Sequence, residues 1–196
     1  LPRNNAILQL SYQNHRFTEK GIPLAINPKS LVTAVAVDPG NKQIIAGTND
    51  DQLILLHPDG RPTGQRFTRT RTSFTALCTF PGQILVGDYF GNITVLQNER
   101  LLPLYQLNED ATPSLNGVYL FKNRYMISTH FGVRGASVKI WDIPAATLLQ
   151  SFLLQANLAY DVRFSRNGDT IYSFHTDEAV FRFYQKGNRF QADTVN

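Results

Sequence analysis

The sequence predicts an all-β fold made of four-stranded sheets that repeat along the chain. The first observation is a period of about forty residues, clearest where residues 35–51 and 162–178 align without a gap over 17 positions. Second, turn residues divide the chain into runs of about four to eight residues, the usual length of strands. Third, no segment keeps a 3.6-residue apolar period over the length of a helix. A repeat whose units bury their apolar faces on one another favours a β-propeller.

Each repeat contains four predicted strands separated by Gly, Pro, Asn and Asp turns. The chain opens with two strands of a preceding unit, at 5–12 and 16–21. The strands of the next four units are 31–37, 43–48, 52–56, 65–70, 73–80, 83–87, 92–96, 102–107, 115–121, 125–130, 137–141, 147–152, 160–164, 170–175, 179–184 and 188–192. Residues 53–56 are all apolar, which predicts burial on both faces. Residues 65–69 are mostly polar, as expected of an outer edge strand.

The spacing of equivalent strands sets the boundaries of the units. Third strands begin near Leu53, Ile93, Val138 and Val180, so they are 40, 45 and 42 residues apart. These spacings fall in the range of four-stranded propeller blades. The predicted units are half a blade at 1–30 and blades at 31–72, 73–114, 115–157 and 158–196. We therefore expect about four and a half blades, all in one propeller domain.

Two stretches resemble the WD-repeat family of β-propellers. Residues 138–142 (Val-Lys-Ile-Trp-Asp) match the ending of a repeat, and 164–168 (Phe-Ser-Arg-Asn-Gly) are similar to the turn after its first strand. Asp50 and Asp177 lie where the family places its tight-turn aspartate. Kelch-like and six-bladed propellers are poorer matches. The repeat and the resemblance together indicate six landmarks of blade structure: Asp50, Asp177, His130, His175, Trp141 and Asp142.

The family usually has seven blades, which has a consequence for this chain. The resemblance implies that the chain is the C-terminal part of a larger propeller, because a ring must close to cover its end blades. The alternatives are a closed five-bladed ring and an open propeller completed by blades on another chain. The missing blades are therefore one candidate partner.

Composition narrows the function classes. Of the 196 residues, 42% are hydrophobic and 17% charged, as in an ordered globular protein. No stretch approaches the roughly 20 apolar residues that span a bilayer, so we expect no membrane partner. The single cysteine, Cys78, has no partner for an internal disulfide, which favours a cytoplasmic or nuclear setting. A formal net charge of +4 permits nucleic-acid binding without requiring it.

No catalytic or cofactor motif is present. The sequence has no Gly-Xaa-Ser-Xaa-Gly elbow, phosphate-cradling glycine loop or zinc-ligand spacing. His130 and His175 end equivalent second strands; either they converge on a central channel to bind metal, or each hydrogen-bonds within its own blade. Cys78 is expected in the core. We expect a protein that is not an enzyme and has no cofactor or metal, with an axial propeller enzyme as the least favoured alternative.

Loops between strands carry the candidate binding residues. The loops from second to third strands, and from fourth strands to the next blade, emerge on one face of a propeller. Six aromatic and arginine residues fall in them: Arg69, Arg71, Tyr89, Phe90, Phe131 and Arg134. This composition is typical of protein-binding hot spots, although the aromatics can instead pack between blades. We expect a scaffold that binds a peptide or protein. The alternative is RNA, with arginines on phosphates and aromatics on bases.

Overall fold

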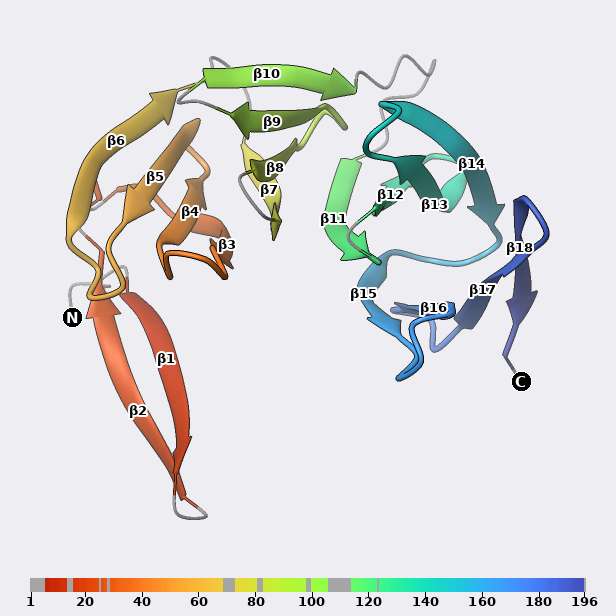
Figure 1. Cartoon of the computed structure of the whole chain (residues 1–196), viewed down its shortest axis with the longest axis horizontal. Coiled ribbons are helices and arrows are strands. Elements are labelled where there is room, and N and C mark those ends of the chain that lie inside the picture. Colours follow the sequence, from red (N-terminus) through yellow and green to blue (C-terminus); the bar gives the residue numbers. More distant parts are fainter. Residues whose placement is uncertain are drawn as a thin grey trace. The chain divides into compact units, whose positions relative to one another are not determined.

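A computed structural model describes residues 6–13, 16–24, 26–27, 29–68, 73–80, 83–97, 100–105, 114–122 and 124–195. Every regular element within these ranges is a β-strand, and none of them contains a helix long and apolar enough to cross a membrane. The strands form one two-stranded and four four-stranded sheets (Figure 1). The sheets are antiparallel and blade-like, so the predicted all-β propeller architecture is confirmed.

The chain divides into two compact units, Leu1–Phe74 and Thr75–Asn196. The first unit contains a two-stranded hairpin and one four-stranded sheet, called blade 1. The hairpin is β1 (Ala6–Gln13) and β2 (Arg16–Pro23); blade 1 is β3 (Val32–Val37), β4 (Ile44–Thr48), β5 (Gln52–Leu56) and β6 (Pro62–Thr68). Ile22 of β2 packs against Ile44 and Ile54 of the blade. The β5 residues from Leu53 to Leu56 are buried, as their apolar sequence predicts.

The second unit contains the other three four-stranded sheets. The exception is Phe74, the first residue of β7, which belongs to the first unit. Blade 2 is β7 (Phe74–Phe80), β8 (Gln83–Asp88), β9 (Ile93–Gln97) and β10 (Arg100–Tyr105). Blade 3 is β11 (Ser114–Phe121), β12 (Tyr125–Gly132), β13 (Gly135–Asp142) and β14 (Thr147–Leu154). Blade 4 is β15 (Ala159–Phe164), β16 (Thr170–His175), β17 (Val180–Lys186) and β18 (Arg189–Thr194). In each sheet the strands are ordered as in the sequence, so short turns suffice to connect them.

Apolar clusters between neighbouring blades hold the second unit together. Leu85 and Ile93 of blade 2 pack with Leu115 and Trp141 of blade 3. A second cluster joins blades 3 and 4 and consists of Phe121, Ile127, Ala136, Val138, Ile140, Leu154, Val162, Ile171, Phe183 and Phe190. The first three strands of blade 3 therefore bury side chains against both neighbouring blades. This explains why a single blade is not a stable unit.

Candidate partner-binding surface

A polar residue lies at or near the end of the second strand in every blade. Strand pairing makes Thr48, Asp88, His130 and His175 equivalent. All four side chains are buried. A buried polar group at this point must find hydrogen-bond partners, and the turn to the third strand supplies them in some blades. In blade 2 this residue therefore sets the shape of the turn that displays Tyr89 and Phe90.

In blade 2 the turn is held by the carboxylate of Asp88, which is 1% exposed. Its Oδ1 accepts hydrogen bonds from the backbone N–H of Phe90 at 3.0 Å and of Asn92 at 2.9 Å. The amide of Asn92 donates to Oδ2 at 2.9 Å. Gly91 closes the turn at φ +81°, a left-handed conformation suited to glycine. The Asp88 carboxylate thus fixes the backbone conformation between Asp88 and Asn92.

This turn displays Tyr89 and Phe90, which are 55% and 46% exposed. Their rings meet edge to face, with centroids 5.7 Å apart, an arrangement that aromatic pairs prefer. Neither ring is buried between blades. The two aromatic rings thus form an exposed apolar pair on a turn whose backbone is held by hydrogen bonds.

In blade 3 the equivalent turn is a tight hairpin. Phe131 is 37% exposed, Val133 is 96% exposed, and Arg134 is exposed and makes no ion pair with any described residue. Gly135 has φ +103°, and a Cβ there would lie 3.0 Å from the carbonyl oxygen of Leu154. The hairpin thus requires glycine at its base. The sequence interpretation missed Val133; its only signal was a β-branched residue where turns usually carry polar ones.

The blade 2 and blade 3 turns lie at the same end of their packed sheets. Gly87, next to the blade 2 turn, faces Leu115 of β11. Leu115 pairs with His130, which is next to the blade 3 turn. We call the exposed residues of these turns the turn surface: Tyr89, Phe90, Phe131, Val133 and Arg134. The other two predicted binding residues, Arg69 and Arg71, lie outside the described residues.

In blade 3, Ser128 connects two of the predicted landmarks, His130 and Trp141. The Trp141 indole Nε1–H donates to Ser128 Oγ at 2.9 Å, and His130 Nε2 lies 2.9 Å from the same oxygen. All three side chains are buried. Because the hydroxyl accepts from the indole, its own proton can be donated to the imidazole. This His–Ser–Trp network joins β12 to β13 beneath the hairpin.

Blades 1 and 4 use their tight-turn aspartates in a related way. In blade 4, Asp177 Oδ2 accepts from the backbone N–H of Asn157 at 2.9 Å, and this bond lowers the pKa of Asp177. The carbonyl of Asn157 lies 2.7 Å from His175 Nδ1. In blade 1, Ser30 Oγ donates to Asp50 Oδ2 at 2.6 Å. Each aspartate therefore ties the segment that enters its blade to the turn between second and third strands.

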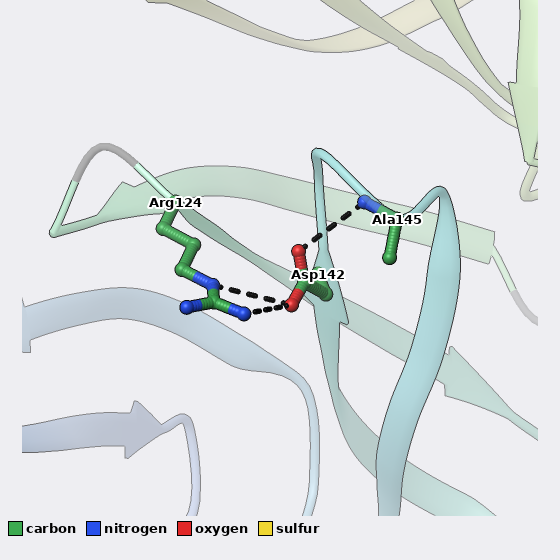
Figure 2. A network of polar contacts seen from close by, with 3 residues as sticks. All are labelled: Arg124, Asp142 and Ala145. Carbon is green, nitrogen blue, oxygen red and sulfur yellow. Dashed lines mark hydrogen bonds and ion pairs between the residues drawn. The ribbon is translucent and has the colours of Figure 1, made fainter.

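Asp142 lies at the opposite end of blade 3 from the turn surface, and Figure 2 shows its contacts with Arg124 and Ala145. Arg124 Nη2 is 2.7 Å and Nε is 3.2 Å from Asp142 Oδ2, and the Ala145 N–H donates to Oδ1 at 3.3 Å. The Arg124 hydrogen bonds hold the pKa of Asp142 below its ordinary value of 3.8. Asp142 thus fixes the β13–β14 turn to the β11–β12 turn.

Replacing Asp142 with asparagine is expected to lower stability at neutral pH and to have less effect in acid. Because the folded-state pKa is lowered, the ion pair stabilises the fold above pH 3.8 and this contribution is lost as pH falls through the lowered pKa. Urea unfolding of both proteins at pH 7 and pH 3 would test this. The difference between their two midpoints is expected to be smaller at pH 3 than at pH 7. A difference that is equal at the two pH values would contradict the assignment.

The remaining candidate groups do not gather into a reactive centre. Within the described residues, no group of three or more His, Cys, Asp and Glu side chains could hold a metal ion. Burial raises the pKa of Cys78 to about 11, so its thiol stays protonated at neutral pH. His57 is exposed in the β5–β6 turn, and His15 lies outside the described residues.

Comparison with known proteins shows the fold alone. No model of a known protein family matches the sequence, and no curated protein does. Among solved structures, 1261 chains match. One is the crystal structure of the computationally designed Ika4 protein, with a TM-score of 0.66 and 19% identity, covering 83% of this chain and 96% of that one. Because so many chains share the fold, function has to be argued from the surface rather than from the fold.

Proposed function

We propose that this chain is a non-catalytic interaction module that binds a peptide or protein partner through the turn surface. The observation that carries the proposal is the combination of exposed apolar and cationic side chains with a blade 2 turn whose backbone is fixed by a buried carboxylate. Asp88 orders the segment bearing Tyr89 and Phe90 before any partner arrives. Little conformational entropy is then lost on binding, which leaves more of the contact energy as affinity. Aromatic and arginine side chains are the common anchors of such interfaces.

The proposed type of module is a WD-repeat propeller with divergent repeats. The support is the buried network of His130, Ser128 and Trp141 in the blade that carries the Trp-Asp pair. Pairing places Phe183 in blade 4 where blade 3 has Trp141, so the indole donor is absent there. The histidines of blades 3 and 4 hydrogen-bond serines of their own sheets. These roles are structural and support a module without catalysis.

The turn surface can be tested with a phage library of random peptides, selected on the immobilised chain. Selected peptides are expected to lose at least about tenfold in affinity for the Phe131→Ala, Arg134→Ala double variant, since two anchors are removed. The matched control is Phe164→Ala, Arg166→Ala. Phe164 is also 37% exposed, and Arg166 is exposed in the turn that follows it, at the other end of its blade.

The control double variant distinguishes specific binding at the turn surface from nonspecific binding to exposed phenylalanine and arginine side chains. Equal loss in the two double variants, or no loss in either, would count against the turn surface. Single-stranded RNA serves as a second probe at about 50 mM salt, where phosphate contacts are strong. RNA binding that depends on Arg134 while no peptide is selected would replace the proposal with the nucleic-acid alternative.

A further inference from the structure

The four outer strands of the blades differ in how their free edges are protected. An outer strand exposes unpaired N–H and C=O groups, and charged residues or proline normally prevent it from pairing with other chains. β6, β10 and β18 contain such residues: Pro62 and Arg66, Arg100 and Pro103, and Arg189 and Asp193. The sequence of β14, Thr-Leu-Leu-Gln-Ser-Phe-Leu-Leu, contains neither a charge nor a proline. Among the outer strands of the blades, β14 alone lacks these protective residues.

The same strand exposes leucine side chains. Leu148, Leu149 and Leu153 are 42%, 47% and 63% exposed. Within the described residues, β14 pairs only with β13, so its outer edge has no strand beside it. The pairing has an irregularity between Ile140 and Trp141, where Leu149 is the extra residue. The bulge interrupts the edge near its start and leaves 150–154 as the regular part of the strand.

We propose that the outer edge of β14 pairs antiparallel with β14 of a second copy of this chain. Two blade 3 sheets would then form one continuous sheet across a two-fold axis, the commonest symmetry of protein dimers. A second copy fits this edge because pairing β14 with itself brings no like charges together, and cross-strand like charges are destabilising. When residues 150–154 pair about their centre, the Leu153 side chains of the two copies become diagonal neighbours on one face of the sheet.

The expected dimer is weak and reversible. A five-residue strand pair buries far less than the roughly 1,200 Å² of a standard stable interface, so association should require micromolar or higher concentrations. This contact uses the outer edge of blade 3 and not the turn surface. Its failure or success is therefore independent of the proposed peptide binding.

Sedimentation velocity over a range of concentrations tests the pairing. The wild-type chain is expected to move from 22.1 kDa towards twice that mass as concentration rises. Leu153→Lys should weaken association at least about tenfold, because a two-fold dimer brings two lysines onto the same face of one sheet. The substitution is at an exposed site, and circular dichroism would check that the fold is kept.

The matched control is Val133→Lys, which adds the same charge at an exposed aliphatic position on the turn surface. It should associate like the wild type. A wild-type chain that stays monomeric at the highest concentration would overturn the proposal. So would a Leu153→Lys variant that dimerises as well as the control.

Discussion

Replacing Trp141 with alanine is expected to lower the free energy of unfolding by about 3–5 kcal/mol, the usual cost of removing a buried large aromatic side chain. Trp141 is 4% exposed and packs in the cluster that joins blades 2 and 3. Alanine would leave a cavity between the two sheets. It would also remove the indole N–H that donates to Ser128, leaving that buried hydroxyl with His130 as its remaining partner.

Trp141→Phe separates packing from hydrogen bonding. Phenylalanine keeps most of the ring but lacks the donor, so we expect a cost of about 1–2 kcal/mol, the range for a lost buried hydrogen bond with a small packing change. Trp141 is the single tryptophan of the chain, so unfolding in urea should be followed by far-UV circular dichroism rather than tryptophan fluorescence. If phenylalanine cost as much as alanine, packing between the blades would not be the main role of Trp141.

The blade pattern could be predicted from the sequence because strand alternation and turn residues are local signals. The run 53–56 has no polar side chain and is buried accordingly. Tyr89 and Phe90 could be placed in a turn from Asp88 and Gly91 beside them. What the local pattern left open was whether these rings face solvent. The hydrogen bonds from the Phe90 and Asn92 N–H groups to Asp88 fix the backbone of this turn, and both rings are exposed on it.

Features that depend on strand register could not be predicted in the same way. Ser128 and Trp141 are 13 residues apart in sequence, and only the pairing of β12 with β13 brings them together. A serine in a strand gives no signal of its own that it connects a histidine to a tryptophan. The free edge of β14 is similar, because its exposed leucines resemble core residues until the sheet order is known. Neither the His–Ser–Trp network nor the free edge of β14 could therefore be recognised from the sequence alone.

Gly87→Val is expected to destabilise the second unit by about 3 kcal/mol, at the upper end of overpacking costs. A Cβ at Gly87 would lie 1.9 Å from Leu115 Cδ2 and 3.2 Å from its Cγ. Leu115 is 1% exposed, so its side chain has little room to move away. Urea unfolding would measure the loss. Gly21→Val is the control, since a Cβ there meets nothing within 4 Å, and a change within about 0.5 kcal/mol is expected.

The equivalent positions suggest that size is matched between neighbouring blades. In the first unit, Gly47 faces the large Phe74, and a Cβ there would lie 2.8 Å from Phe74 Cβ. In blade 3 the equivalent residue is Thr129, and the first residue of the next blade is the small Ala159. A larger residue on the second strand thus accompanies a smaller one on the following blade. Because interiors are close-packed, the pair must share one limited volume.

This size matching predicts that Leu115→Ala rescues Gly87→Val. Leu115→Ala alone should cost about 2–5 kcal/mol through the cavity that it leaves. In the double variant the valine fills part of that cavity and no longer meets Leu115 Cδ2. The combined cost should therefore fall below the sum of the single costs by about 1–3 kcal/mol, the size of coupling seen between contacting residues. Strictly additive costs would show that the two side chains do not share a volume, and that the glycine is required for its backbone instead.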